Sequence, residues 1–177
     1  VANQYSYIGL IQKLHLGESE KALENYINAV KIYIELNDST EIAEEANNAG
    51  EILFEFGDYK SAVYYLNLSI SHENEVEDYS EFTGRIAALS ISYLLTGNVD
   101  KGVETAEKAS IICQEHNLYG ESAVLSIMTG IPMIMTGHPD IAINNFEKAL
   151  LNIDRLESDP ESMNNFKLWI NIYTGIA

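Results

Sequence analysis

Four glycines recur at intervals of forty residues and constrain the fold more than any other feature of the chain. They are Gly17, Gly57, Gly97 and Gly137. Glycine enters the left-handed region of backbone space without a steric penalty, so each of these positions predicts a tight turn. A fixed period of this length is typical of solenoids, in which similar units stack one on the next. The sequence therefore predicts repeated helical hairpins with a turn at each glycine.

The stretch around Gly57 shows one hairpin in full. A helix is predicted to end at this glycine, and Asp58 directly after it can cap the helix that follows. Asp38 and Glu41 form a further capping pair. The predicted helices lie at about 3–15 and 19–36, 40–56 and 59–73, 79–96 and 99–116, and 119–136 and 139–156.

Small residues fall into columns when the repeats are aligned with the turn glycine at position 15. Small residues let two helices approach closely, and a larger residue fills the space between repeats. Position 8 holds Leu10, Gly50, Ser90 and Gly130, position 20 holds Ala22, Ala62, Gly102 and Ala142, position 24 holds Tyr26, Leu66, Ala106 and Phe146, and position 27 holds Ala29, Ser69, Ala109 and Ala149.

These columns resemble tetratricopeptide (TPR) repeats over residues 3–162. The resemblance implies an all-α fold, a right-handed superhelical solenoid of antiparallel helix pairs that forms a single array over 1–177. Its repeats would cover about 3–42, 43–82, 83–122 and 123–162, with a partial fifth repeat or capping helix at 163–177. Phe166, Trp169, Ile170 and Tyr173 would form the apolar face of that last segment.

The chain departs from the family pattern in two ways. Its period is forty residues rather than about 34, and the tryptophan expected near position 4 is absent. The longer period resembles the long-helix TPR variants of kinesin light chains, cell-polarity adaptors and bacterial peptide-sensing regulators. HEAT repeats have a similar period, but the Gly-Asp-Tyr turn and the alanine columns favour TPR.

In TPR arrays the first helix of each pair lines a concave groove, so the resemblance implies which side chains face a ligand. The first repeat contributes one such residue, the second a polar and acidic stripe, and the third and fourth apolar residues. The expected groove residues are Tyr7, Glu44, Asn47, Asn48, Glu51, Glu55, Ile91, Leu95, Ile127, Met128, Ile131 and Met135.

The predicted helix at 119–136 is apolar on nearly every side, so something must cover more than one of its faces. Its methionines would tolerate a variable apolar ligand. A peptide ligand, a neighbouring copy of the chain, a further repeat or the curvature of the array itself could each provide the cover. The sequence leaves these possibilities open.

The charge balance limits the partners. The chain has 27 Asp and Glu residues against 10 Lys and Arg, a net charge of −17, which repels phosphate backbones. We therefore expect no direct binding of nucleic acid. A basic partner is permitted but not implied, because an acidic surface also serves solubility. The apolar runs are too short to span a bilayer, no leader is apparent, and Cys113 is the only cysteine, so we expect a cytoplasmic protein.

Patterns for catalysis or metal binding are sparse. The four histidines, at positions 15, 72, 116 and 138, lie in different repeats, and none has a metal-ligating partner one helical turn away. Carboxylate pairs such as Glu51 and Glu55 suit a solvated helix face better than acid–base chemistry. We expect no metal, no cofactor and no enzymatic activity.

The sequence thus predicts a non-enzymatic scaffold that binds a peptide or helix of a partner protein in its groove. Two alternatives remain open. The chain could be the ligand-sensing TPR half of a larger transcriptional or signalling regulator. It could also be a homo-oligomerisation module that uses the fourth repeat and the terminal helix.

Overall fold

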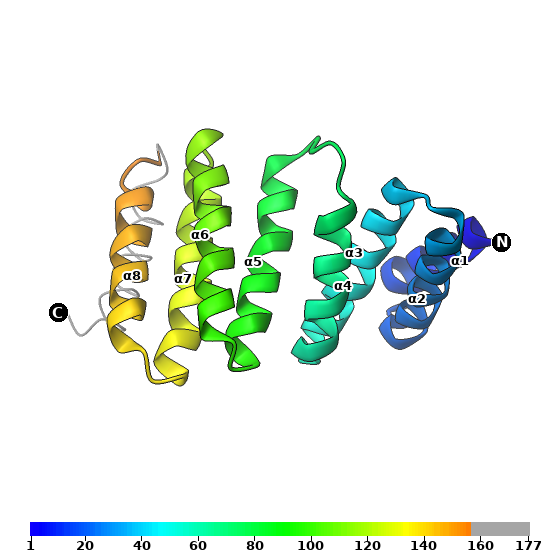
Figure 1. The fold of residues 1–177 in the computed structure, drawn as a ribbon, viewed down its shortest axis with the longest axis horizontal. Helices are drawn as coiled ribbons and strands as arrows, with labels where there is room; N and C mark the ends of the chain where they lie inside the picture. Colours follow the sequence, from blue (N-terminus) through cyan, green and yellow to red (C-terminus); the bar gives the residue numbers. More distant parts are fainter. Residues whose placement is uncertain (157–177) are drawn as a thin grey trace. The chain divides into compact units, whose positions relative to one another are not determined.

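The computed structural model describes residues 1–156, and this part of the chain is all-helical, without β-strands (Figure 1). The segment 163–177, predicted as a partial repeat or cap, lies outside the described residues. In order along the chain, the elements are α1 (Ala2–Ile11), η1 (Gln12–Leu16), α2 (Ser19–Leu36), α3 (Ser39–Glu55), α4 (Tyr59–His72), α5 (Tyr79–Leu95), α6 (Val99–Glu115), α7 (Tyr119–Met135) and α8 (Pro139–Ile153).

The chain forms two compact units, Val1–Glu77 and Asp78–Ala177, which we call unit 1 and unit 2. Within unit 1, α1 packs on α2, α2 on α3, and α3 on α4. Within unit 2, α5 packs on α6 and α7, and α7 also packs on α6 and α8. Neighbouring helices thus pair as predicted, whereas the single array across both units stays a prediction.

The four turn glycines occupy the left-handed region, as predicted. Their φ values are 63°, 77°, 83° and 83° for Gly17, Gly57, Gly97 and Gly137. Asp58 caps α4 by accepting a hydrogen bond from the Ser61 N–H at 3.2 Å. Asp38 caps α3 in the same way, from the Glu41 N–H at 3.4 Å. The turn glycines and the caps of α3 and α4 are therefore local signals that the sequence carries.

The small-residue columns lie where helices meet. A Cβ atom added to Gly50 would lie 2.8 Å from the Leu66 side chain, and one added to Gly130 would lie 2.7 Å from the Phe146 ring. The residues at positions 20 and 27 are buried in all four hairpins. Close packing of each pair therefore depends on these columns, as predicted.

The first hairpin corrects one column assignment. Leu10 is 43% exposed, and Gly9 instead packs against Tyr26, whose ring would lie 2.9 Å from an added Cβ. The cause is the π-helix η1, which replaces the end of the predicted 3–15 helix and accommodates one extra residue before Gly17. Residues ahead of η1 are shifted by one, so Tyr7 moves from the fifth position of its repeat to the sixth.

Candidate functional site

The predicted groove residues of unit 1 lie on α1 and α3. Tyr7 is 68% exposed on α1, and four further apolar residues of α1 and η1 are exposed, namely Ile8, Leu10, Ile11 and Leu14. On α3 the carboxylates at both ends of the predicted stripe are exposed, and the amide and carboxylate side chains between them are partly or fully buried. Glu44 and Glu55 are exposed, Asn48 and Glu51 are half-buried, and Asn47 is buried.

An ion pair connects the first helical segment to α3. Lys13 of η1 donates to Glu51 Oε2 at 2.9 Å, and Asn47 donates to Glu51 Oε1 at 3.1 Å. The pair is only partly shielded from solvent, so its contribution to stability is modest. Its main consequence is positional, because it holds the acidic stripe of α3 beside η1. Short π-helices are frequent at functional sites.

Glu45, also on α3, has a buried carboxyl group. Its side chain is 3% exposed, and burial, with the charges of Glu44 and Glu41, raises its pKa to about 7 against a hydrogen bond from Ser6. Burial and the charge of Glu45 raise the pKa of Tyr26 to about 12. This cluster is the most perturbed titratable site in the described part of unit 1, and perturbed groups mark candidate functional positions.

Three buried polar atoms of this region have no hydrogen-bond partner within the described residues. They are Tyr26 Oη, Glu45 Oε2 and Asn47 Oδ1. Buried polar atoms without partners are uncommon in native proteins. Sequence reasoning missed Glu45 because position 3 of a repeat is not a groove position. The available signal was a glutamate in a column that holds Leu125 in the fourth repeat.

The predicted groove residues of unit 2 divide into an exposed and a buried set. Met128 and Met135 are exposed and Ile131 is half-buried, and Val124, one helical turn before Met128, is exposed as well. Their spacing of four, three and four residues places them on one side of α7. We call these four residues the α7 stripe. The other predicted residues contribute less surface: Leu95 is half-buried, whereas Ile91 and Ile127 are buried.

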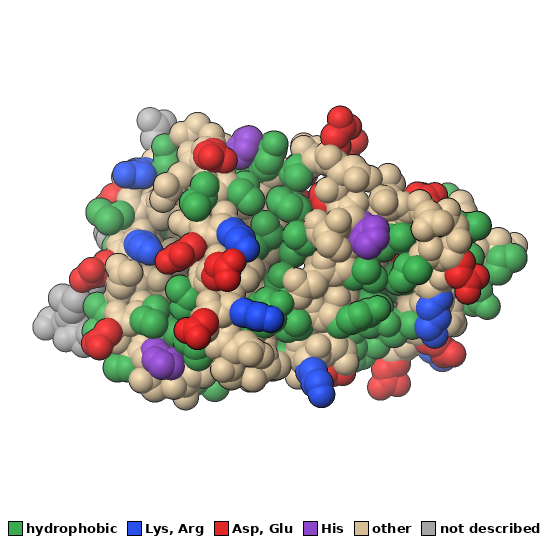
Figure 2. Space-filling model, viewed as in Figure 1, with side chains coloured by type: hydrophobic (Ala, Val, Ile, Leu, Met, Phe, Trp, Pro, Cys, Tyr) green, Lys and Arg blue, Asp and Glu red, His purple; other side chains and the backbone are tan. Residues whose placement is uncertain are grey.

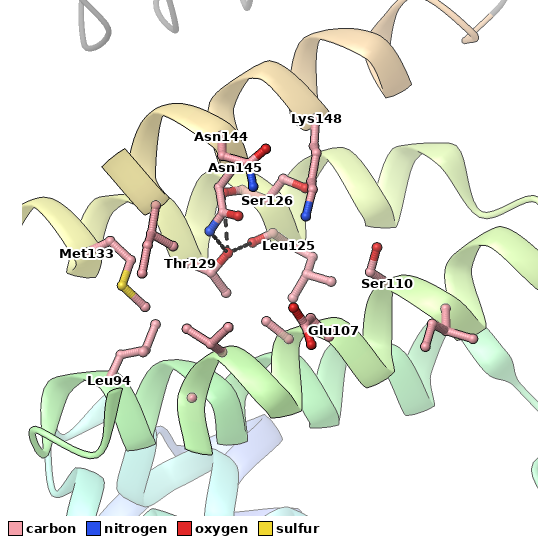
Figure 3. A pocket seen from close by; sticks show the side chains of 15 residues that line it. Leu94, Glu107, Ser110, Leu125, Ser126, Thr129, Met133, Asn144, Asn145 and Lys148 are labelled. Carbon is pink, nitrogen blue, oxygen red and sulfur yellow. Dashed lines mark hydrogen bonds between the residues drawn. The ribbon is translucent and has the colours of Figure 1, made fainter. Parts of the chain in front are cut away.

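A cavity of about 320 Å³ lies between α6, α7 and α8, away from the α7 stripe (Figure 3). Leu94, Leu125 and Met133 provide an apolar part of its lining. Hydrogen bonds hold Thr129 there: it donates to the Leu125 carbonyl at 2.8 Å and, more weakly, to the Ser126 carbonyl at 3.4 Å, and it accepts from Asn145 at 3.1 Å. The cavity therefore combines an apolar wall with fixed polar groups.

Charged and polar side chains line the remaining walls of this cavity. Glu107 and Ser110 belong to α6, whereas Asn144 and Lys148 belong to α8, on the opposite side (Figure 3). The sequence signal for this cavity was Ala106, the one small residue in a column otherwise filled by Tyr26, Leu66 and Phe146. The small residue could be seen in the sequence, but it did not predict a cavity until the structure showed which residues surround it.

Acidic and basic side chains are interspersed over the face that α6 and α8 present, without a patch of one sign (Figure 2). Within residues 1–156, no three or more His, Cys, Asp or Glu side chains are grouped so that they could hold a metal ion. None of the described helices is both long and apolar enough to cross a membrane. Compared with models of known protein families the sequence matches none, and it matches no curated protein.

Proposed function

We propose that this chain is a non-enzymatic, TPR-type scaffold that binds a peptide or helix of a partner protein. One observation carries the proposal: unit 1 has exposed apolar side chains on α1 and η1 and an acidic stripe on α3, and a side-chain contact connects η1 to that stripe. The Lys13–Glu51 ion pair, at 2.9 Å, joins the two. We call this surface the α1–α3 face; its apolar members are Tyr7, Ile8, Ile11 and Leu14, and its acidic members are Glu44, Glu51 and Glu55.

The chemistry of the α1–α3 face selects a basic, amphipathic segment. Apolar anchors on the partner would bury Ile11 and its neighbours, and lysine or arginine side chains would face Glu44 and Glu55. The net charge of −17 would also draw a basic partner toward the surface. The α7 stripe is a second exposed surface that could bind a peptide, but it is purely apolar. Its Met128 and Met135 side chains can adapt to differing side chains of a partner.

The proposed TPR-type architecture is supported by the antiparallel hairpins and by the buried small-residue columns. Gly50 against Leu66 and Gly130 against Phe146 are the close approaches that such packing needs. The right-handed superhelix, the cytoplasmic location and the lack of nucleic-acid binding stay predictions.

Titration with defined peptides tests this function. An 18-residue amphipathic helix of leucine and lysine is the probe, and its leucine–glutamate counterpart is the control ligand. We expect the lysine peptide to bind and the glutamate peptide not to bind. Ile11→Asp and Glu44→Lys should each weaken binding by about tenfold or more, equivalent to roughly 1.4 kcal/mol.

A matched variant separates a specific face from general attraction. Glu24 is exposed on α2 in the same unit, so Glu24→Lys makes the same charge change away from the α1–α3 face. Binding should be nearly unchanged in Glu24→Lys at about 0.15 M salt, where distant surface charges are screened. Equal losses in Glu24→Lys and Glu44→Lys would contradict a defined peptide site.

One observation favours homo-oligomerisation as a second candidate function. Met135 is 73% exposed at the end of the α7 stripe, and exposed apolar surface of this kind also suits a second copy. Sedimentation velocity of the chain and of Met128→Glu decides this point. A dimer that Met128→Glu dissociates supports self-association, whereas a monomer at all concentrations excludes it.

A further inference from the structure

The cavity between α6, α7 and α8 exists because unit 2 departs from the packing that unit 1 uses at equivalent positions. Two periods of forty residues separate equivalent positions, so Ala106 corresponds to Tyr26. In unit 1 this place is a core cluster in which Tyr26 packs with Ala22, Ala49 and Ile52. In unit 2, alanine leaves that space open, and the cavity borders Ala106.

Some residues around the opening are polar where unit 1 has apolar ones, and the reverse holds at Leu125, which corresponds to Glu45. Ile27 and Tyr65, which pack against the unit 1 cluster, correspond to Glu107 and Asn145, which line the cavity. A third change places Lys148 where unit 1 has Leu68. Glu107, Asn144 and Lys148 are exposed at the mouth of the cavity, whereas Thr129 is buried inside it. Polar groups are therefore available to a ligand both at the mouth of the cavity and within it.

The polar groups of the cavity have opposite charges on opposite walls. Glu107 projects from α6 and Lys148 from α8, and neither makes an ion pair within the described residues (Figure 3). Asn144, on the Lys148 wall, adds an amide, and Ser110, on the Glu107 wall, adds a hydroxyl group. These groups match a ligand with an ammonium group at one end and a carboxylate at the other.

The size and the apolar wall of the cavity further limit which ligands could bind. About 320 Å³ is at the lower end of ligand-binding pockets, which span roughly 300–1,000 Å³. Leu125 and Met133 would receive an apolar side chain. We propose that this cavity binds a zwitterionic amino acid or dipeptide with an apolar side chain, its ammonium facing Glu107 and its carboxylate facing Lys148. This site is separate from the α1–α3 face and does not depend on the function proposed for it.

Titration of the full chain with Leu-Leu and with free leucine, followed by NMR, tests this proposal. We expect saturable shifts of α6, α7 and α8 amides below about 10 mM for at least one of the two ligands. N-acetylation and C-amidation of that ligand should each weaken binding tenfold or more. The absence of saturation with both ligands would overturn the proposal.

Three variants assign the contacts. Glu107→Gln should weaken binding of the zwitterion tenfold and leave the affinity for its N-acetylated form unchanged. Lys148→Gln should also weaken binding of the zwitterion tenfold, and it should leave the affinity for the C-amidated form unchanged. Glu115→Gln, an exposed residue of α6 outside the cavity, is the control and should change nothing. Ala106→Leu introduces the residue that the second repeat has in this column and should abolish binding while the chain stays folded. Unaltered binding to Ala106→Leu would contradict the assignment. So would an equal loss of affinity of Glu107→Gln for the free and the N-acetylated ligand.

Discussion

Unit 1 and unit 2 share a backbone plan but distribute polarity in opposite ways. On the first helix of their second hairpins, Glu44, Asn48 and Glu55 of α3 correspond to Val124, Met128 and Met135 of α7. On the other side of these helices the polarity is reversed: unit 1 has an apolar cluster around Tyr26, whereas unit 2 has the cavity with polar groups.

This comparison shows which positions the fold needs. Both units have turn glycines and small residues at the helix contacts, Gly9 and Gly50 in unit 1 and Gly102 and Gly130 in unit 2, because these residues set backbone conformation and the approach of helices. Other positions vary from apolar to charged, while α3 and α7 keep equivalent boundaries. The repeat thus supplies the frame, and the variable columns give each unit its own recognition surface.

The largest change in the free energy of unfolding is expected when Tyr26 of unit 1 is replaced by the alanine that unit 2 has at the equivalent position. Tyr26 is 1% exposed, and Tyr26→Ala removes a ring that fills the core. We expect a loss of about 4 kcal/mol in the free energy of unfolding, as for other large aromatic truncations. Hydrogen exchange should report the loss in α2 and α3. Unchanged protection of those amides would show that the ring is not a core element.

The next effect concerns the buried carboxyl group that unit 2 replaces with Leu125. Glu45 has a folded pKa of about 7 against an ordinary value of 4.5, so the folded state retains a proton that the unfolded state releases. This group therefore lowers the free energy of unfolding as pH rises from about 4.5 to about 7, by roughly 3 kcal/mol. Chemical denaturation at pH 5 and pH 8 should show that Glu45→Gln loses this drop and that Glu24→Gln, at an exposed position on α2, keeps it. A drop that persists in Glu45→Gln would assign it to other groups.

A smaller and equal effect is expected at the turns, where the units are alike. Gly57 and Gly97 have φ values of 77° and 83°, and nothing within 4 Å would meet an added Cβ. Gly57→Ala and Gly97→Ala should each cost about 1 kcal/mol, from backbone strain alone. Denaturant midpoints of the two variants are the measurement. A cost that differs several-fold between them would show that the turns are not equivalent.

The smallest effect is expected when the opening in unit 2 is closed. Ala106→Leu adds apolar contact in a half-buried place, so we expect a gain in the free energy of unfolding of no more than about 1 kcal/mol. Thermal unfolding without added ligand measures it. A loss of more than about 2 kcal/mol would show overpacking, and would mean that the place is already filled in solution.

Local signals account for what could be predicted from the sequence. Helix boundaries follow from turn glycines and from caps such as Asp58, because each acts within a few residues. The π-helix could not be predicted, since its extra residue precedes Gly17 and leaves the forty-residue spacing of the glycines intact. That shift brings Ser6 rather than Tyr7 to the fifth position, and the Ser6 side chain forms a hydrogen bond with the buried Glu45.

The candidate sites were less predictable than the fold. The acidic stripe and the α7 stripe were visible as sequence patterns, but Ile91 and Ile127 proved to be buried, because residues on the flank of a helix pack or not according to their neighbours. The cavity needed three elements to be placed together, since Ala106, Thr129 and Lys148 lie on separate helices.

The most direct test of the proposed function is to locate a bound peptide on the chain. The leucine–lysine helix is titrated into the labelled full chain, and amide shifts are recorded. The account predicts that the largest shifts fall on α1, η1 and α3, around Ile11 and Glu44. Shifts concentrated on α2 and α4, or spread evenly over all exposed carboxylates, would contradict it.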